Sequence, residues 1–194
     1  MTLTKRLPHS PASAGGDLAA GCALAAASPA RLFLALWPTP DASAQLIQYL
    51  EQWAWPKGSS PVRADRLHLT LHFIGGVDRQ RVATIGAGLQ VPLRPFEVQL
   101  TQAAIWPRGL AVLQTTAPPE PLTQLHAELA AALRALGLAV EARPFRPHLT
   151  LARRAAGATP PAAAPTLCWR VDHYVLVESL LGAGGGYQIR RRYG

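Results

Sequence analysis

The chain has 194 residues, of which 49% are hydrophobic, and this suits one ordinary domain with a complete hydrophobic core. No apolar run reaches the roughly 18 residues that a membrane-spanning helix needs, so no such helix is expected. The formal net charge of +8 comes almost entirely from arginine, which favours polyanionic partners, although a generally arginine-rich proteome would give the same balance.

The two cysteines, Cys22 and Cys168, stand far apart and form no CxxC or Cys/His ligand pattern. This spacing indicates neither a disulfide-stabilised scaffold nor a zinc site. We therefore expect a protein of the reducing cytoplasm.

The N-terminal segment differs in composition from the rest of the chain. Residues 1–30 are rich in Ala, Ser, Pro and Gly and are predicted to form a disordered, low-complexity tail. Lys5, Arg6 and several prolines interrupt the apolar core that a secretory signal requires. The segment that ends at Cys22 weakly resembles a lipoprotein cleavage site, but the polar residues before it favour a chance match. Residues 31–194 are then predicted to form a single domain.

The first half of this domain alternates strands with helices. Residues 31–37 have the pattern of a buried strand, and residues 39–41 (Thr-Pro-Asp) are typical of a helix start, with a capping side chain and a proline in the first turn. The apolar stripe of this helix is Leu46, Ile47, Leu50 and Trp53. A strand over residues 67–74 ends at a Gly-Gly pair, and Asp78 begins a second helix. The buried face of that helix is Val82, Ile85 and Leu89.

The second half has a similar succession. Residues 96–106 and 110–115 alternate well enough to pair as a hairpin. A helix then begins near residue 118 and ends at Gly137. Its apolar stripe is Leu122, Leu125, Leu129, Leu133 and Leu136. Two more strands are predicted at residues 167–177 and 187–193, with a glycine-rich loop between them.

One six-residue sequence occurs twice, as Arg-x-His-Leu-Thr-Leu at residues 66–71 and again at residues 146–151. The two histidines are 148 − 68 = 80 residues apart. The alternation of His and Thr with leucines is typical of a β-strand with one apolar face, so each His and its Thr point the same way. Chance would give such a four-residue word on the order of 10⁻³ times or fewer in a chain of this length, so the repeat indicates a function.

The repeat also predicts the fold class. A helix, a motif strand and a hairpin recur in both halves, which favours an α+β fold of two pseudo-symmetric lobes. Each lobe would be an antiparallel sheet with outer helices, and the two motif strands would face a central groove.

Two histidines at one groove suit cleavage of a phosphodiester by general acid–base catalysis, because one removes a proton while the other supplies one. His68 and Thr70 would lie about 6.6 Å apart along one strand face, so the hydroxyl can bind a non-bridging phosphate oxygen. His148 and Thr150 would do the same from the second strand. The alternative is a repeat kept for packing alone, but packing needs only the leucines and gives no reason for the polar residues to repeat.

A metal site is the other chemistry that the histidines suggest. His68 and His72 have the i, i+4 spacing of zinc ligands on a helix. On a strand they would be about 13 Å apart along one face, too far to share one ion. No metal is therefore expected. His126 is predicted to be an ordinary surface or boundary residue, and His9 and His173 have no catalytic partner in the sequence.

With these residues in view, the chain resembles the RNA 2′,3′-cyclic phosphodiesterases, also called the 2′-5′ RNA ligase family, of the two-histidine phosphoesterase superfamily. The resemblance covers residues 31–194 and is carried by both His-Leu-Thr-Leu motifs and their flanks. These flanks are Arg31 to Leu36, Phe73 to Val77, Arg146-Pro147, Glu178-Ser179-Leu180 and Gly186-Tyr187.

The resemblance implies hydrolysis of a 2′,3′-cyclic phosphate at an RNA end to a 2′-phosphate, without a metal or nucleotide cofactor. It implies that His68 is the proton donor and His148 the proton acceptor, while Thr70 and Thr150 hold the phosphate. The two copies are nearly identical, so the residues alone leave open which histidine is the acid.

The resemblance also implies that Phe73 and Arg153, each five residues after a motif histidine, hold the terminal base and the phosphate. Strict alternation would turn both away from the histidines, so we expect a bulge or a strand end there. Two alternatives remain: a phosphodiesterase that acts on another 2′,3′-cyclic or 2′-5′-linked nucleotide, and a non-catalytic RNA-binding module. RNA ligation to a 2′-5′ bond is the same step run backward. Nothing in the sequence suggests an oligomer, so a monomer is expected.

Overall fold

The structure, a computed structural model, describes residues 28–163, 165–180 and 185–194. Its strands are β1 (Ala30–Leu36), β2 (Ser60–Pro61), β3 (Leu69–Val77), β4 (Phe96–Leu100), β5 (Gln102–Trp106), β6 (Leu110–Gln114), β7 (His148–Arg153), β8 (Leu167–Val171), β9 (Tyr174–Ser179) and β10 (Tyr187–Tyr193). Its helices are α1 (Pro40–Glu51), α2 (Arg81–Gly88) and α3 (Glu120–Ala135), with a 3₁₀ turn at Ala64–Arg66.

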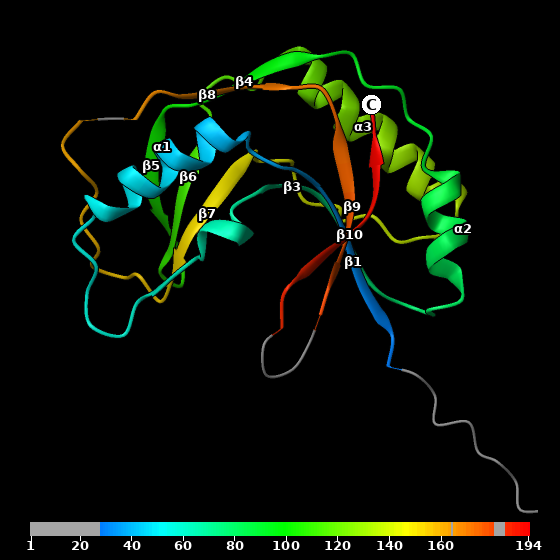
Figure 1. The fold of residues 1–194 in the computed structure, drawn as a ribbon, viewed down its shortest axis with the longest axis horizontal. Coiled ribbons are helices and arrows are strands. Elements are labelled where there is room, and N and C mark those ends of the chain that lie inside the picture. Colours follow the sequence, from blue (N-terminus) through cyan, green and yellow to red (C-terminus); the bar gives the residue numbers. More distant parts are fainter. Residues whose placement is uncertain (1–27, 164, 181–184) are drawn as a thin grey trace, which may run out of the picture.

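Most strands belong to one antiparallel sheet, in the order β10-β9-β1-β3-β7-β6-β5, with β2 paired to β7. The described register between β3 and β7 is a single pair, Leu69 with Leu149, so the sheet divides there into two lobes. One lobe holds β10, β9, β1 and β3, and the other holds β7, β6, β5 and β2. Figure 1 shows the two lobes as the sides of an arch. The predicted α+β fold with two antiparallel lobes is confirmed.

The lobes do not coincide with the two halves of the chain. The first motif strand, β3, shares its lobe with β9 and β10 from the C-terminal end, while β5 and β6 from the first half pair with the second motif strand, β7. The helices cross over in the same manner, because α1 follows β1 but lies beside the β5–β7 lobe in Figure 1, and α3 follows β6 but packs on β3. The sequence order of the elements therefore did not predict their partners.

The helix starts and buried stripes largely match the sequence pattern. The Thr39 side chain accepts a hydrogen bond from the Ala42 backbone N–H at 3.3 Å, and Pro40 is the first residue of α1. Four of the five leucines predicted for the α3 stripe are buried, whereas Leu136 is the C-cap residue and half-buried, and Gly137 follows it with φ of +70°. The stripe predicted for α1 was wrong at Ile47, which is exposed, because the buried side of that helix passes through Ala42, Leu46 and Tyr49.

Three predicted strands have different boundaries. The segment at residues 96–106 divides after Leu100, so that only β5 forms the hairpin with β6, and β4 pairs with β8 in a separate two-stranded sheet. Both β4 and β8 bury alternate side chains, which favours their mutual pairing. The segment at residues 167–177 is likewise interrupted at Asp172 and His173, and β3 continues through its Gly-Gly pair to Val77.

The predicted tail at residues 1–30 lies outside the described residues except for its last three, of which Ala30 is buried and already belongs to β1. The predicted glycine loop tip also lies largely outside them. No helix in the described part of the chain is long and apolar enough to cross a membrane.

Candidate active site

The two motif strands meet at their leucines. Leu69 and Leu149 are partners in the antiparallel register, and both side chains are fully buried in the core. The residues on either side of each leucine therefore point to the opposite face, which is the groove. These four residues, none of them fully buried, are His68, Thr70, His148 and Thr150.

The register fixes how these side chains face one another. Continued by one residue on each side of the Leu69–Leu149 pair, the antiparallel register puts His68 opposite Thr150 and Thr70 opposite His148. Opposite Cβ atoms in an antiparallel pair are about 4.5–5.5 Å apart, and diagonal ones about 7–8 Å. The two histidines are diagonal neighbours, so a single phosphate group fits between them.

Both imidazoles are oriented by the same backbone contact. The Nδ1 atom of His68 lies 2.7 Å from the carbonyl oxygen of Arg66, and that of His148 lies 2.6 Å from the carbonyl oxygen of Arg146. A carbonyl oxygen only accepts, so Nδ1 carries the proton and Nε2 is left to face the groove. The repeated Arg-x-His sequence thus builds the same tautomer twice.

Aromatic rings surround His68. Trp37 stacks on its imidazole at 5.2 Å between ring centroids and 13° between planes. Phe33 lies at 4.9 Å, and Tyr187 meets the ring edge-on at 5.3 Å. The guanidinium of Arg66 in turn lies over the Tyr187 ring at 5.8 Å.

His148 has a smaller version of this arrangement. Trp106 is tilted against its ring at 4.4 Å, and the guanidinium of Arg146 lies over Trp106 at 5.5 Å. The arginine of each motif therefore packs on an aromatic ring that packs on the motif histidine. Of these aromatic residues, Trp37 and Trp106 had no signal in the sequence beyond their places at the ends of predicted strands.

Burial makes both imidazoles poor bases in the free protein. Burial lowers the pKa of His68 to about 4, and the nearby charges of His148 and Arg153 act in the same direction, against the hydrogen bond to Arg66. Burial also lowers the pKa of His148, with a further contribution from the positive charge of Arg143. At neutral pH both imidazoles are therefore uncharged when the groove holds no anion.

Each motif strand has a β-bulge three residues after its histidine. In β3 the extra residue is Leu71, because Thr70 pairs with Ala35 while His72 pairs with Leu34. In β7 the extra residue is Leu151, because Thr150 pairs with Val112 of β6 while Ala152 pairs with the adjacent Ala111. The expected bulge is confirmed in both copies.

The bulges turn the fifth residue after each histidine back to the groove face. Phe73 is 49% exposed and lies 6.2 Å from Phe33, which itself contacts His68. Arg153 is exposed, and its charge reaches His68. Both side chains are therefore exposed near His68, and their contacts with the substrate stay a prediction.

The same bulge moves His72 to the other face of β3. Its side chain is buried, and its Nε2 donates to the His126 carbonyl at 2.8 Å. The two imidazoles stack at 3.9 Å, and Phe145 stacks on the far side of His126, also at 3.9 Å. The prediction that His72 shares a face with His68 was wrong, because strict alternation fails at Leu71.

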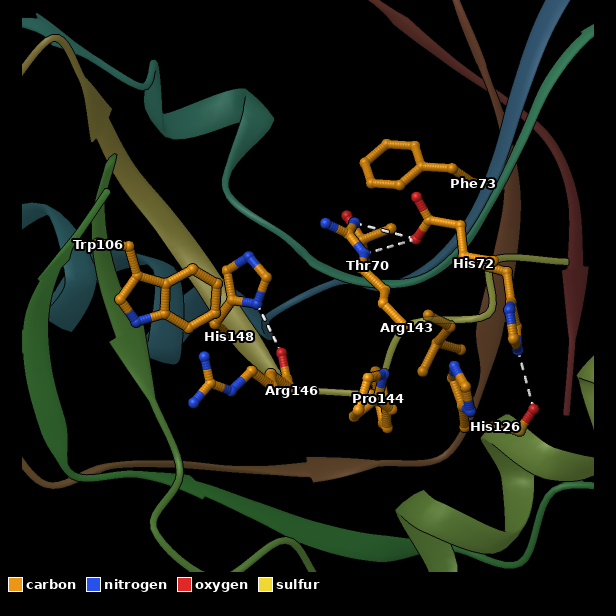
Figure 2. A pocket seen from close by; sticks show the side chains of 12 residues that line it. Thr70, His72, Phe73, Trp106, His126, Arg143, Pro144, Arg146 and His148 are labelled. Carbon is orange, nitrogen blue, oxygen red and sulfur yellow. Dashed lines mark hydrogen bonds and ion pairs between the residues drawn. The ribbon is translucent and has the colours of Figure 1, made fainter. Parts of the chain in front are cut away.

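A pocket opens between the motif strands. Figure 2 shows Trp106 and His148 at one end, Thr70 and Phe73 farther along with Arg143 beside them, and the stacked pair His72 and His126 at the other end. Of the predicted site residues, Thr70, Phe73 and His148 line this pocket, whereas His68, Thr150 and Arg153 do not. Arg143 forms an ion pair with Glu141 at 2.9 Å and was not recognised from the sequence. Among the described residues there is no group of three or more side chains arranged to hold a metal ion. The chemistry available here is that of two imidazoles, hydroxyl groups and guanidinium groups.

Comparison with known proteins identifies the family. A family model described as the 2′-5′ RNA ligase superfamily matches residues 38–183. The chain belongs to this superfamily. It is 34% identical over 170 residues to the RNA 2′,3′-cyclic phosphodiesterase of Escherichia coli (strain K12), covering 85% of this chain and 93% of that protein. It is 31% identical to the protein of the same name from Thermus thermophilus, covering 80% and 84% of the two chains.

Solved structures from the superfamily agree with this assignment. The crystal structure of E. coli LigT complexed with 3′-AMP has a TM-score of 0.75 and 28% identity, and covers 85% of this chain and 97% of that one. The complex of LigT with phosphate has a TM-score of 0.73, 26% identity, and coverage of 86% and 98%. The resemblance found in the sequence is thereby confirmed.

The stacked histidines predict an acid-sensitive fold. Burial and the neighbouring His72 lower the pKa of His126 to about 4, below its ordinary value of 6.5. Between these values the unfolded chain binds more protons than the folded one, so the free energy of unfolding falls as pH falls through this range. His126→Phe keeps the stack on Phe145 and removes the titration. Urea unfolding at several pH values should give a pH dependence that is flatter by about 1 kcal/mol or more between pH 6.5 and 4. An unchanged slope would show that His126 does not titrate with folding.

Proposed function

We propose that this chain hydrolyses the 2′,3′-cyclic phosphate at the end of an RNA to a 2′-phosphate. The observation that carries the proposal is the Leu69–Leu149 register, which sets two Nδ1-protonated histidines diagonally across one groove. The superfamily membership supports it, as do relatives named RNA 2′,3′-cyclic phosphodiesterase.

The proposed reaction is one in-line displacement at phosphorus. His148 Nε2 removes a proton from a water molecule, whose oxygen bonds to phosphorus as the bond from phosphorus to the 3′ oxygen breaks. His68 Nε2 donates its proton to that departing oxygen. The products are a 2′-phosphate and a free 3′-hydroxyl. The hydroxyls of Thr70 and Thr150 donate to the non-bridging oxygens, where they stabilise the charge of the transition state.

The substrate contacts follow from the two bulges. The exposed ring of Phe73 offers a stacking surface for the terminal base, since every base has a π-face. Arg153 offers a guanidinium to the phosphate, a group that matches phosphate geometry well. Both motif strands come from the same chain, so the site needs no second copy, and we propose that the protein acts as a monomer in the cytoplasm.

The acid role of His68 depends on the substrate. Its pKa of about 4 in the free protein leaves it mostly neutral, whereas a general acid must carry a proton. The bound phosphate is an anion beside the imidazole, and an opposite charge at that range raises a histidine pKa. Binding of the substrate therefore raises the pKa of His68 and favours its protonated form.

This coupling predicts two different pH profiles. Activity requires neutral His148 and protonated His68, so it is lost both at low and at high pH. The profile of kcat/KM reports the free protein, and both of its limbs should lie at or below about pH 6.5, because both pKa values are lowered there. The profile of kcat should shift to higher pH. Limbs of kcat/KM that both lie above pH 7 would contradict the lowered pKa values.

The central experiment is product analysis with an RNA that ends in a 2′,3′-cyclic phosphate, in the presence of EDTA. The expected product is a 2′-phosphate. His68→Ala and His148→Ala should each reduce kcat by about 10²- to 10⁴-fold with the fold intact by circular dichroism. Thr70→Val should lose roughly 10-fold or more, because it removes one donor to the transition state.

The matched control is Thr116→Val, since Thr116 is exposed in the connection between β6 and α3. It should retain full activity. A 3′-phosphate product, a metal requirement, or near wild-type rates in both histidine variants would overturn the proposed function. Tight binding of the RNA without turnover would favour the RNA-binding module instead.

A further inference from the structure

A second hollow adjoins the active site at the end of β1. Trp37 belongs to both, because it stacks on His68 and also lines this hollow. The other walls are the start of α1, the turn between β8 and β9, and the end of β10. The cationic side chains that line it are Arg170 and Arg192.

The strand register places Arg192 on the groove face of the sheet. Arg192 pairs with Val175, Val175 pairs with Ala35, and Ala35 pairs with Thr70. Directly paired residues in an antiparallel sheet point to the same side, so Arg192 and the phosphate-binding Thr70 share one face. Three strand spacings of about 4.8 Å put their backbones roughly 14 Å apart. Arg192 is therefore beyond the reach of the terminal phosphate itself.

Arg192 is held in position by its neighbours. Its Nη1 donates to His173 Nε2 at 2.9 Å, and His173 Nδ1 donates to Asp172 Oδ1 at 2.6 Å. Among the described residues the contact with His173 is the one side-chain hydrogen bond of Arg192, so its other N–H groups can donate to a ligand. Arg170 also lines the hollow. Its lining therefore carries two guanidinium groups and one carboxylate, that of Asp172.

We infer that this hollow binds the phosphodiester backbone of the RNA on the 5′ side of the cyclic phosphate, with Arg192 and Arg170 as the phosphate ligands. The inference rests on the proposed function and adds a substrate preference to it. Arginine binds phosphate with parallel hydrogen bonds, and a pre-oriented guanidinium loses little freedom on binding. Phe73 lies in β3 five residues after His68, whereas Trp37 stacks on His68 itself and also lines the hollow, so the base and the upstream backbone have separate places.

The test compares a cyclic mononucleotide with an oligoribonucleotide that ends in the same cyclic nucleotide. The wild type should have the higher kcat/KM for the oligonucleotide, through a lower KM. Arg192→Gln should reduce that advantage by roughly 3- to 10-fold and leave turnover of the mononucleotide unchanged. The dependence of log kcat/KM on log salt concentration should also become less steep, by about 0.7 for each phosphate of a single strand that the variant no longer neutralises.

The matched control is Arg94→Gln, which removes the same charge from an exposed residue between α2 and β4. It should keep both the length preference and the salt dependence. Equal effects of the two variants, or a wild type without any preference for the oligonucleotide, would overturn the inference. In either case turnover of the mononucleotide would continue, whereas failure of the proposed function would abolish turnover of both substrates.

Discussion

Leu69 and Leu149 make the one backbone pairing that the described residues provide between β3 and β7, and the site depends on it. Because both leucines are drawn into the core, the His and Thr residues on either side of them are turned to the groove. Because the pairing is antiparallel, each histidine lies opposite the threonine of the other motif. A shift of either strand by one residue would turn the His and Thr of that strand into the core and its leucines into water.

The lobes that flank this pairing give the two histidines different surroundings. His68 lies among Phe33, Trp37 and Tyr187, whereas in the described part of the chain Trp106 is the one aromatic ring against His148. A sequence repeat that is nearly symmetric is thus placed in an asymmetric environment. The two imidazoles therefore differ in their aromatic surroundings, although their sequence motifs are nearly identical.

The sequence predicted the elements that depend on local pattern. The cap at Thr39, the leucine stripe of α3 and the alternation of the motif strands are all short-range signals, and the structure has each of them. The repeat itself indicated the candidate site, since polar residues recur at positions where packing needs only the leucines.

Long-range features were not predictable in this way. The pairing of β4 with β8 joins segments about 70 residues apart in the chain, and the local sequence of residues 96–100 does not predict it. The bulge at Leu71 was anticipated only through the resemblance, and its effect on His72 was missed. Once one residue is added to the strand, the alternation reverses, so His72 stacks on His126 beneath the sheet. Trp37 and Trp106 reach the histidines through tertiary packing alone.

The most direct test of the paired-histidine geometry is an imidazole ¹⁵N NMR titration with a nucleoside 2′-phosphate, with the signals assigned by His68→Asn and His148→Asn. The structure predicts that both imidazoles carry the proton on Nδ1 in the free protein, and that the ligand raises the pKa of both, since each Nε2 faces the same anion. A response from only one histidine, or a proton on Nε2 in the free protein, would contradict the single phosphate site between the two motifs.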